Sequence, residues 1–401
     1  MESVLRIGII AHLKHPIGEP FAGGLEMHTH MLQSQLVSRG HAVTIFASTH
    51  SDPGSNLEPI CDETSISEVG LAEAPDHAFF QEHHAYLSLM NRLRLSDFDI
   101  IHNNSLHYLP VAMADVLPMP IVTTLHTPPF SWLESGIRLC RSPQASFVAV
   151  SNSIRISWTP VVPISRVILN GIDLNRFRFQ SAPDSKPYLV WCGRIVPEKG
   201  LHFAIAACRA IGAELRIAGP ISDEDYFERE IRPSLSQTIV YLGHLKHEGI
   251  AALVGGARAS LCTPCWDEPY GLVVAEALAC GVPVAAFARG AIPELLDATC
   301  GILANKDDVA SLAQAAKQAQ TLDRAACRAM AERSCDVSRM IDDYEALYRQ
   351  LSTKTGARSL EHFGRAASKA HIVSKPRPSP TEVKINVVQN ADIATRQTVL
   401  A

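Results

Sequence analysis

The sequence predicts an α/β protein built from two domains, each with a parallel, doubly wound sheet. Short apolar runs alternate with amphipathic stretches, which is the rhythm of strands and helices in a parallel sheet. This rhythm occurs twice along the chain, and a segment with two prolines separates the two series. The length of 401 residues also exceeds the roughly 250–300 residues at which a single core stops growing.

The expected strands follow from these apolar runs. In the first series they are Val4–Ile10, Val43–Ala47, Ile100–His102, Ile121–Leu125 and Phe147–Val150. In the second series they are Tyr188–Cys192, Glu214–Ala218, Ile239–Tyr241, Ala259–Cys262 and Val282–Phe287. The linker is predicted at Gln180–Pro187, because its two prolines interrupt both helix and strand. The two domains are therefore expected at residues 1–180 and 181–335.

The end of the chain changes character. Residues 336–351 place Met340, Tyr344, Leu347 and Leu351 at helical spacing, which predicts one further amphipathic helix. Residues 352–401 contain eight Lys or Arg and three Asp or Glu, with three prolines at alternate positions. This composition predicts a basic, disordered tail.

Composition excludes several classes of protein. Charged residues make up 19% of the chain and the net charge is −5, which excludes a polybasic nucleic-acid binder and a disordered chain. No apolar run approaches the ~18 residues of a membrane-spanning helix, and residues 1–10 are typical of a buried strand rather than a signal peptide. We expect a cytoplasmic protein with at most peripheral membrane contact. The ten scattered cysteines are expected to be reduced.

The strongest local motif is Glu268–Glu276 (EPYGLVVAE), which follows a predicted strand and opens a helix. Gly271 permits close backbone approach, and free N–H groups at the helix start near Leu272 form an anion site. Glu276 lies about 7 Å further along that helix at ~1.5 Å per residue. A diphosphate at the helix end would place a ribose near Glu276. Glu268 precedes the helix, on the other side of the diphosphate, and would face the group attached to the second phosphate.

Three other loops that follow predicted strands carry residues suited to the same kind of ligand. Gly193–Gly200 (GRIVPEKG) follows the first strand of the second series, and Arg194 and Lys199 can neutralise charge on a leaving diphosphate. Gly23 and Gly24 permit close approach at a helix start after the first strand. His126 follows the strand Ile121–Leu125, at the sheet edge where ligands gather. The turn Asn170–Asp173 is interpreted as structural, although Asn170 could reach the cleft.

These motifs, in this order and spacing, resemble the retaining GT-B glycosyltransferases of the family-four (group 1) type, from about residue 4 to 351. The resemblance implies two Rossmann-like domains that face each other across a cleft, with helix 336–351 crossing back to the first domain. It also implies a hexosyltransferase that moves a sugar from a nucleotide-diphosphate sugar to an acceptor hydroxyl with retention of configuration. No metal or other cofactor is expected. The donor base, the sugar and the acceptor are not specified by the sequence.

The resemblance assigns roles to individual residues. Arg194 and Lys199 hold the donor diphosphate, Glu268 contacts the sugar, Glu276 binds the ribose and His126 contacts the transferred sugar. The glycines and the start of the second-domain helix complete the donor site: Gly23, Gly24, Gly193, Gly271 and Leu272.

Two alternatives remain open. A nucleotide-sugar epimerase on the same fold would share the phosphate and ribose contacts, and a catalytically silent nucleotide-sugar-binding scaffold would keep the same residues without turnover. A glycoside hydrolase would have no use for two phosphate-binding loops. Metal sites are not favoured, because Cys262 and Cys265 form a lone CxxC pair and residues 223–225 (DED) are typical of a first helical turn.

Overall fold

The computed structural model describes residues 3–52, 56–60, 76–164 and 166–366. The first part of the chain contains β1 (Arg6–Ile10), α1 (Gly24–Ser38), β2 (Ala42–Ala47), β3 (Leu57–Pro59), α3 (His77–Leu93), β4 (Ile100–Asn103), α4 (Tyr108–Ala112), η1 (Ala114–Val116), β5 (Ile121–Leu125), α5 (Ser131–Leu139), β6 (Ala145–Ala149), α6 (Asn152–Trp158) and β7 (Arg166–Val167).

The second part contains β8 (Leu189–Cys192), η2 (Pro197–Lys199), α7 (Leu201–Ile211), β9 (Leu215–Ala218), α8 (Glu224–Tyr226), η3 (Phe227–Ile231), η4 (Arg232–Ser234), β10 (Ile239–Tyr241), α9 (His247–Gly255), β11 (Ala259–Cys262), α10 (Leu272–Ala279), β12 (Val284–Phe287), α11 (Ile292–Leu295), β13 (Gly301–Ala304), α12 (Val309–Ala319), α13 (Arg324–Ser334) and α14 (Val337–Ala366).

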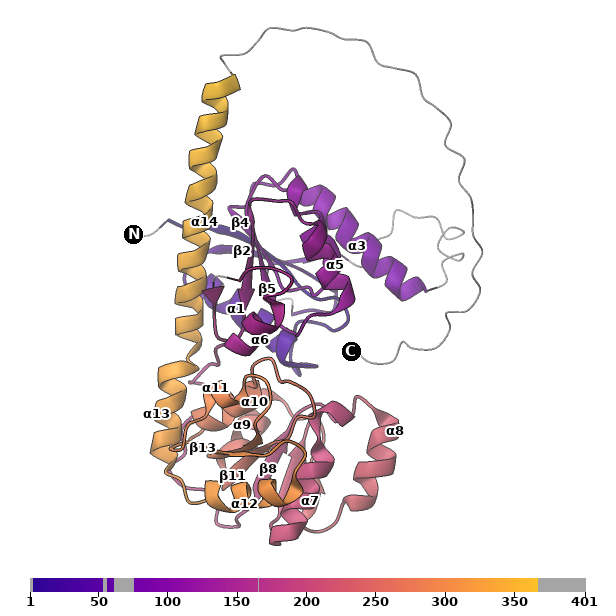
Figure 1. Ribbon diagram of the computed structural model, residues 1–401, viewed down its shortest axis with the longest axis vertical. Helices are drawn as coiled ribbons and strands as arrows, with labels where there is room; N and C mark the ends of the chain where they lie inside the picture. Colours follow the sequence, from indigo (N-terminus) through magenta and orange to yellow (C-terminus); the bar gives the residue numbers. More distant parts are fainter. Residues whose placement is uncertain (1–2, 53–55, 61–75, 165, 367–401) are drawn as a thin grey trace. The chain divides into compact units, whose positions relative to one another are not determined.

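The described strands form two sheets, as predicted (Figure 1). Their orders are β3-β2-β1-β4-β5-β6-β7 and β10-β9-β8-β11-β12-β13, and the pairings between these described strands are parallel. The central strands β4, β5, β11 and β12 are buried along their whole length because helices cover both faces of a doubly wound sheet. Strands β3, β7 and β13 were not expected; each is only two to four residues long and lies at the edge of its sheet.

The strand order fixes where a ligand can bind. In the first sheet the order reverses between β1 and β4, and in the second between β8 and β11. The loops that leave two such neighbouring strands diverge to opposite faces, which opens a crevice at the carboxyl ends of the strands. The loops after β1, β8 and β11 carry the predicted glycine, cation and carboxylate motifs.

Helices cover the first sheet on both faces. One core cluster joins β1 and β2 to residues of α1 and α14, whereas another joins Phe46 and Ile101 to α3 and α4. In the second sheet, α7 and α12 share a core with Trp191 and Phe287, and α10 and α13 contribute to a further cluster. That last cluster also contains Leu125 and Trp158 of the first domain.

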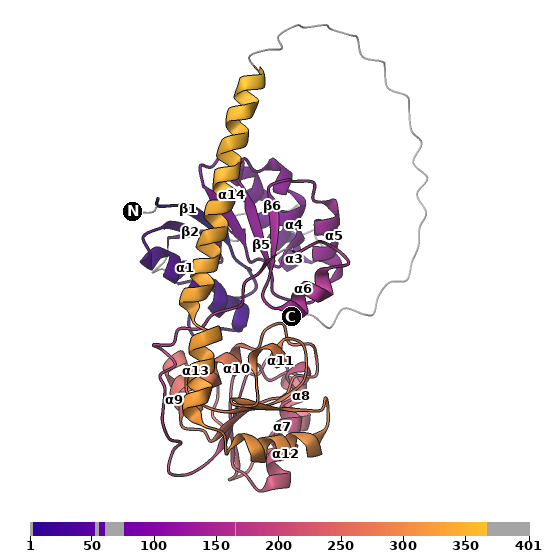
Figure 2. The same cartoon turned by 60° about the vertical axis from the view of Figure 1, so that its left-hand side comes forward.

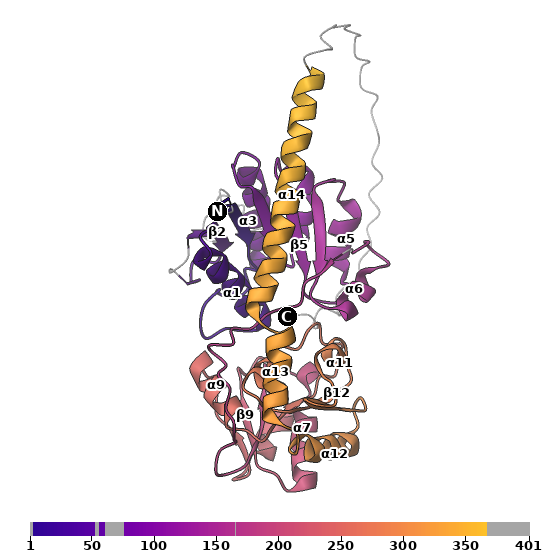
Figure 3. The same ribbon diagram turned by 90° about the vertical axis from the view of Figure 1, so that its left-hand side faces the viewer.

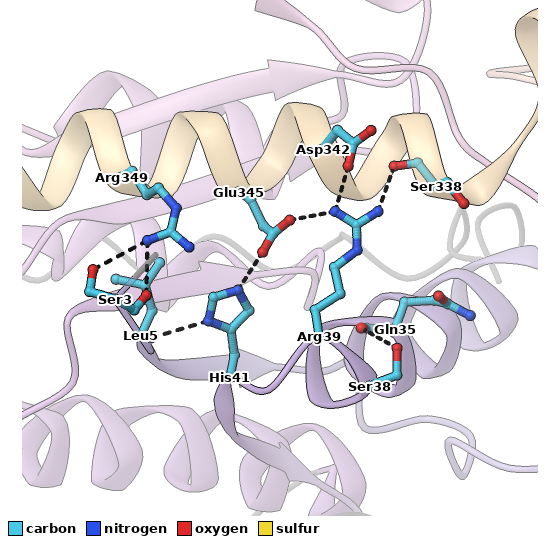
Figure 4. Close-up of polar contacts among 10 residues, drawn as sticks. All are labelled: Ser3, Leu5, Gln35, Ser38, Arg39, His41, Ser338, Asp342, Glu345 and Arg349. Carbon is cyan, nitrogen blue, oxygen red and sulfur yellow. Dashed lines mark hydrogen bonds and ion pairs between the residues drawn. The ribbon is translucent and has the colours of Figure 1, made fainter. Parts of the chain in front are cut away.

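Helix α14 returns to the first domain, which confirms the predicted crossing (Figure 2). The hydroxyl of its buried Tyr344 is hydrogen bonded to Thr124 of β5 at 3.0 Å. The hydroxyl of Tyr348 is hydrogen bonded to His102 of β4. On its polar side, Glu345 contacts both Arg39 and His41 (Figure 4). These bonds attach the last helix to both the sheet and α1.

The helix is longer than predicted. It was expected to end at residue 351, yet α14 continues to Ala366, so residues 352–366 are helical rather than disordered. This stretch has no proline and contains Ala357, Leu360 and Glu361, which favour helix. The rest of the predicted tail, 367–401, lies outside the described residues.

The chain passes between the two domains twice, and the two passages are joined. Ile172 and Asp336 form a parallel bridge, with Ile172 N–H donating to the Cys335 carbonyl at 2.8 Å. Gly171 is required here, because a Cβ at this position would lie 2.4 Å from the Cα of Val337. The Asn-Gly-Ile-Asp turn therefore has a structural role, as expected.

None of the helices in the described part of the chain is long and apolar enough to cross a membrane.

Candidate active site at the carboxyl edges of the two sheets

The loop from Gly193 to Gly200 leaves β8 at the switch point of the second sheet. Its first residue is held against the neighbouring strand, because Gly193 N–H donates to the Ala218 carbonyl at 3.1 Å. A Cβ on Gly219 would lie 1.8 Å from the Gly193 carbonyl oxygen. Two backbones thus meet at a distance that only glycine permits, which fixes where the loop begins.

Thr263 connects this loop to the one that follows β11. Its hydroxyl donates to the Gly200 carbonyl at 2.9 Å and accepts from the Trp191 indole at 3.1 Å. Gly200 has φ +66°, and a Cβ there would lie 2.0 Å from the Thr263 carbonyl oxygen. A backbone bond from Cys265 N–H to the Glu198 carbonyl, 2.8 Å long, adds a second connection. The two loops are therefore positioned as one unit.

Lys199 and Glu268 meet within this unit. The Lys199 ammonium donates to Glu268 Oε2 at 2.7 Å, and the Trp266 indole donates to the same oxygen at 3.1 Å. Lys199 also lies over the Trp266 ring, 5.2 Å from its centre. Their side chains are 21% and 15% exposed, so the pair is largely shielded from solvent. The structure brings two of the four predicted catalytic residues into direct contact.

Arg194 lies on the same loop and is more open. Its side chain is 30% exposed, and its guanidinium lies 4.0 Å from Glu198. Charges so placed are only weakly paired, because a contact at this distance and exposure contributes little to stability. Arg194 thus lies with Lys199 on the loop that leaves β8 at the switch point.

Helix α10 begins at the same edge. Its N-cap, Gly271, has φ +99°, and no side chain caps the helix start. The first N–H groups of α10, beginning with Leu272, therefore form the partly positive end of a helix dipole. Glu276 lies further along α10 and is 8% exposed. Burial raises the pKa of Glu276 to about 7.

The first domain contributes the loop after β1. Gly23 is the N-cap of α1, in extended conformation, and Gly24 is its first residue. A Cβ on Gly24 would lie 2.7 Å from Leu272 Cδ1, so the start of α1 contacts the start of α10. The predicted glycines of one domain and the predicted helix start of the other are therefore adjacent.

The domains touch again at α6 and α11 (Figure 3). Both carboxylate oxygens of Glu294 accept backbone N–H groups of α6, from Asn152 at 2.9 Å and from Ser153 at 2.7 Å. A carboxylate at a helix start is favoured by the helix dipole.

His126 lies at the carboxyl end of β5 and is 9% exposed. Its Nε2 is 2.9 Å from Asn104 Oδ1, and the amide nitrogen of Asn104 is 3.5 Å from Thr29. Since an amide oxygen only accepts, His126 carries its proton on Nε2. Burial lowers the pKa of His126 well below its usual range, and neighbouring His28 and His102 lower it further. His126 is therefore a neutral imidazole at pH 7.

Sequence reasoning missed three residues that shape this site. Trp266 contacts both members of the ion pair, Thr263 connects the two loops, and Asn104 orients His126. Asn104 and Thr263 immediately follow β4 and β11, the strands that border the two switch points, and Trp266 lies four residues after the end of β11. The position of these residues in the chain, after β4 or β11, was the available signal. That position indicates a site only once the strand order is known.

Asp223 accepts from Tyr226 N–H at 2.8 Å and caps α8. Cys262 and Cys265 are free thiols, as is every other cysteine in the described ranges. No group of three or more His, Cys, Asp or Glu that could hold a metal ion occurs in that part of the chain.

Family patterns match both halves of the chain. The family described as Glycosyltransferase Family 4 matches residues 22–176, and Glycosyl transferases group 1 matches residues 186–321. The chain belongs to the group 1 glycosyltransferases. The two matched ranges include every candidate site residue described above, so this glycosyltransferase carries its motifs inside the regions that define the family.

Individual relatives agree with this assignment. The chain is 27% identical over 339 residues to a glycogen synthase of Mycobacterium tuberculosis, covering 74% of this chain and 82% of that protein. It is 22% identical over 354 residues to the MMP alpha-(1->4)-mannosyltransferase of Mycolicibacterium hassiacum, covering 72% and 84%.

Solved structures show the same fold. Sucrose-phosphate synthase from Thermosynechococcus elongatus superimposes with a TM-score of 0.69 at 20% identity, covering 87% of this chain and 100% of that one. The Anabaena protein HepE, described in complex with UDP and glucose, gives a TM-score of 0.67 at 17% identity and covers 86% and 100%. The GT-B architecture expected from the sequence is thereby confirmed.

Proposed function

We propose that this glycosyltransferase uses a nucleotide-diphosphate sugar as donor and transfers its hexose to an acceptor hydroxyl with retention of configuration. The observation that carries the proposal is the meeting of two loops at the β8/β11 switch point. One loop carries Arg194 and Lys199, and the other leads into α10 and carries Glu268, which pairs with Lys199 at 2.7 Å. A switch point of this kind is suited to a diphosphate. The complex described for the HepE structure, with UDP and glucose, supports a nucleotide donor of this type.

The diphosphate is the group on which charge develops. As the bond from the anomeric carbon to the diphosphate oxygen breaks, its electron pair passes to the diphosphate. Arg194, Lys199 and the first N–H groups of α10 stabilise that charge. The acceptor oxygen forms the new bond on the same face of the sugar, and its proton leaves with the diphosphate. No covalent sugar–enzyme intermediate is needed in this route.

The ion pair supports the assignment of Glu268. A lone lysine in a shielded site would lose hydration without compensation, so Glu268 compensates Lys199 for that loss and orients it before the donor arrives. The Trp266 indole holds the same carboxylate oxygen, which leaves the other oxygen of Glu268 for a sugar hydroxyl.

His126 and Glu276 complete the donor contacts. With its proton bonded to Asn104, neutral His126 offers Nδ1 as an acceptor for a hydroxyl of the transferred sugar. Glu276 lies roughly 7 Å along α10 from the phosphate end, at ~1.5 Å per residue, where a ribose would follow the diphosphate. Its carboxylate can accept two hydroxyl hydrogen bonds. Gly193, Gly23 and Gly24 permit close backbone approach on either side.

Donor turnover tests this function. We expect release of free nucleotide from one of UDP-glucose, GDP-mannose, ADP-glucose or dTDP-glucose, in the presence of EDTA, since the proposed site uses side-chain cations in place of a metal. Proton NMR of the first-formed glycoside should show the same anomeric configuration as the donor. An inverted product would contradict retention, and conversion of the donor to a second nucleotide sugar would instead indicate an epimerase.

A further inference from the structure

Three aromatic side chains, two exposed and one half-buried, form a group on the first domain. Phe79 lies in the first turn of α3, Tyr108 begins α4 and Trp132 is the second residue of α5. Trp132 is 51% exposed and Phe79 is 43% exposed. We call Phe79, Tyr108 and Trp132 the aromatic platform. The three helices are neighbours, with α4 in contact with both α3 and α5 (Figure 2).

The platform is an ordered stack. Tyr108 and Trp132 lie 5.4 Å apart between ring centres with planes 23° apart, and Phe79 lies 5.9 Å from Trp132. The Tyr108 hydroxyl is 3.0 Å from His83 Nε2. A Cβ on Gly136 would lie 2.8 Å from the Tyr108 carbonyl oxygen, so α5 is packed directly on the backbone of α4. An exposed tryptophan held in place in this way presents a fixed flat face.

Two members of the platform lie shortly after the strand ends that carry site residues. Helices α4 and α5 follow β4 and β5, whose carboxyl ends carry Asn104 and His126, and these two residues are hydrogen bonded. Tyr108 is four residues from Asn104 and Trp132 is six from His126. At ~3.6 Å per extended residue, these separations are at most about 14 Å and about 22 Å. The platform is therefore within reach of a molecule bound beside the transferred sugar.

The chemistry of the platform favours a neutral carbohydrate. Flat aromatic faces provide rigid apolar area, and Tyr108 and His83 add polar groups at the edge, which together suit a ring with an apolar face and peripheral hydroxyls. The charged residues on α5 neutralise each other, since Glu134 and Arg138 form a 2.7 Å ion pair. A phosphorylated acceptor would require unpaired cations, which the described platform does not offer.

We propose that the aromatic platform is the acceptor-binding surface and that the acceptor is a neutral saccharide whose ring stacks on Trp132. This inference rests on the proposed function, because it assigns the second substrate of the same site. The acceptor hydroxyl that is glycosylated then points toward His126, and the remaining rings of the saccharide extend over Tyr108 and Phe79.

Calorimetric titration of the full chain with maltotetraose, cellotetraose, mannotetraose and chitotetraose tests the proposal. The titrations are made in the presence of whichever nucleotide stabilises the chain. We expect one saccharide to bind, and Trp132→Ala to weaken its binding about ten-fold or more. Trp132→Phe should restore most of the affinity, because it retains an aromatic face. Leu139→Ala is the matched control, because Leu139 is an exposed apolar residue at the far end of α5.

Each outcome has a distinct meaning. Unchanged saccharide binding by Trp132→Ala would overturn the platform, as would a wild-type chain that binds nucleotide but none of the four saccharides. An equal loss in Leu139→Ala would show a general effect on α5 and would also contradict the proposal. Absence of nucleotide binding by the wild type would instead mean that the proposed function itself is wrong.

Discussion

Lys199→Met should lower turnover by about 10²–10³-fold, because Lys199 supplies a cation at the position where charge develops on the diphosphate. Methionine keeps most of the side-chain stem while removing the ammonium group. Nucleotide release from the donor, measured at saturating donor concentration, gives the rate. Lys317→Ala, which removes an exposed lysine of α12, is the matched control and should turn over as the wild type does.

The same substitution leaves Glu268 without its ion-pair partner, so lost folding must be separated from lost catalysis. The double variant Lys199→Met with Glu268→Gln removes the unpaired charge and should recover any stability that Lys199→Met loses. Its turnover should stay low. If Lys199→Met were as active as the Lys317→Ala control, the assignment of the cation site would be wrong.

Glu276→Gln should stabilise the ligand-free protein at pH 8 and weaken donor binding. Burial raises the pKa of Glu276 from 4.5 to about 7, so the folded protein holds this proton where the unfolded chain releases it. The contribution of protonated Glu276 to the free energy of unfolding is therefore fully present below about pH 4.5 and is lost as the pH rises through about 7. A shift of this size corresponds to about 3 kcal/mol.

Glutamine is uncharged at every pH, so the stability advantage of Glu276→Gln should be below about 1 kcal/mol at pH 5 and reach up to about 3 kcal/mol at pH 8. Urea unfolding at the two pH values measures it. Glu198→Gln, an exposed glutamate beside the same crevice, is the control and should show no such pH dependence. A Glu276→Gln variant with unchanged stability at pH 8 would contradict the assignment of Glu276 as a buried carboxylate that gains its hydroxyl donors when the ribose binds.

The parallel sheets and the motif loops could be predicted because each rests on a local signal. Apolar runs such as Tyr188–Cys192 indicate buried strands, and Gly271 with Glu276 indicates a helix start with a carboxylate one turn on. Strand order was not readable from the sequence. It follows from packing, and it explains why the loops after β8 and β11 meet while being about 70 residues apart.

Contacts between distant residues were likewise beyond sequence reasoning. Nothing near Lys199 in the sequence indicates that Thr263 and Trp266 fix its loop and its ion pair. The neutral state of His126 depends on burial beside His28 and His102, which come from α1 and β4. The length of α14 was underestimated because the basic composition after residue 351 outweighed its helix-forming residues in the prediction.

The most direct test of the donor site is a thermal-shift panel with UDP, GDP, ADP and dTDP, without added metal, on the wild type and on Lys199→Met. A nucleotide at about 100 times its dissociation constant stabilises the native state by roughly 2.7 kcal/mol. The proposed site predicts a clear shift with one nucleotide for the wild type and a smaller shift for Lys199→Met. No shift with any nucleotide, or equal shifts for both proteins, would contradict a diphosphate site at the β8/β11 edge.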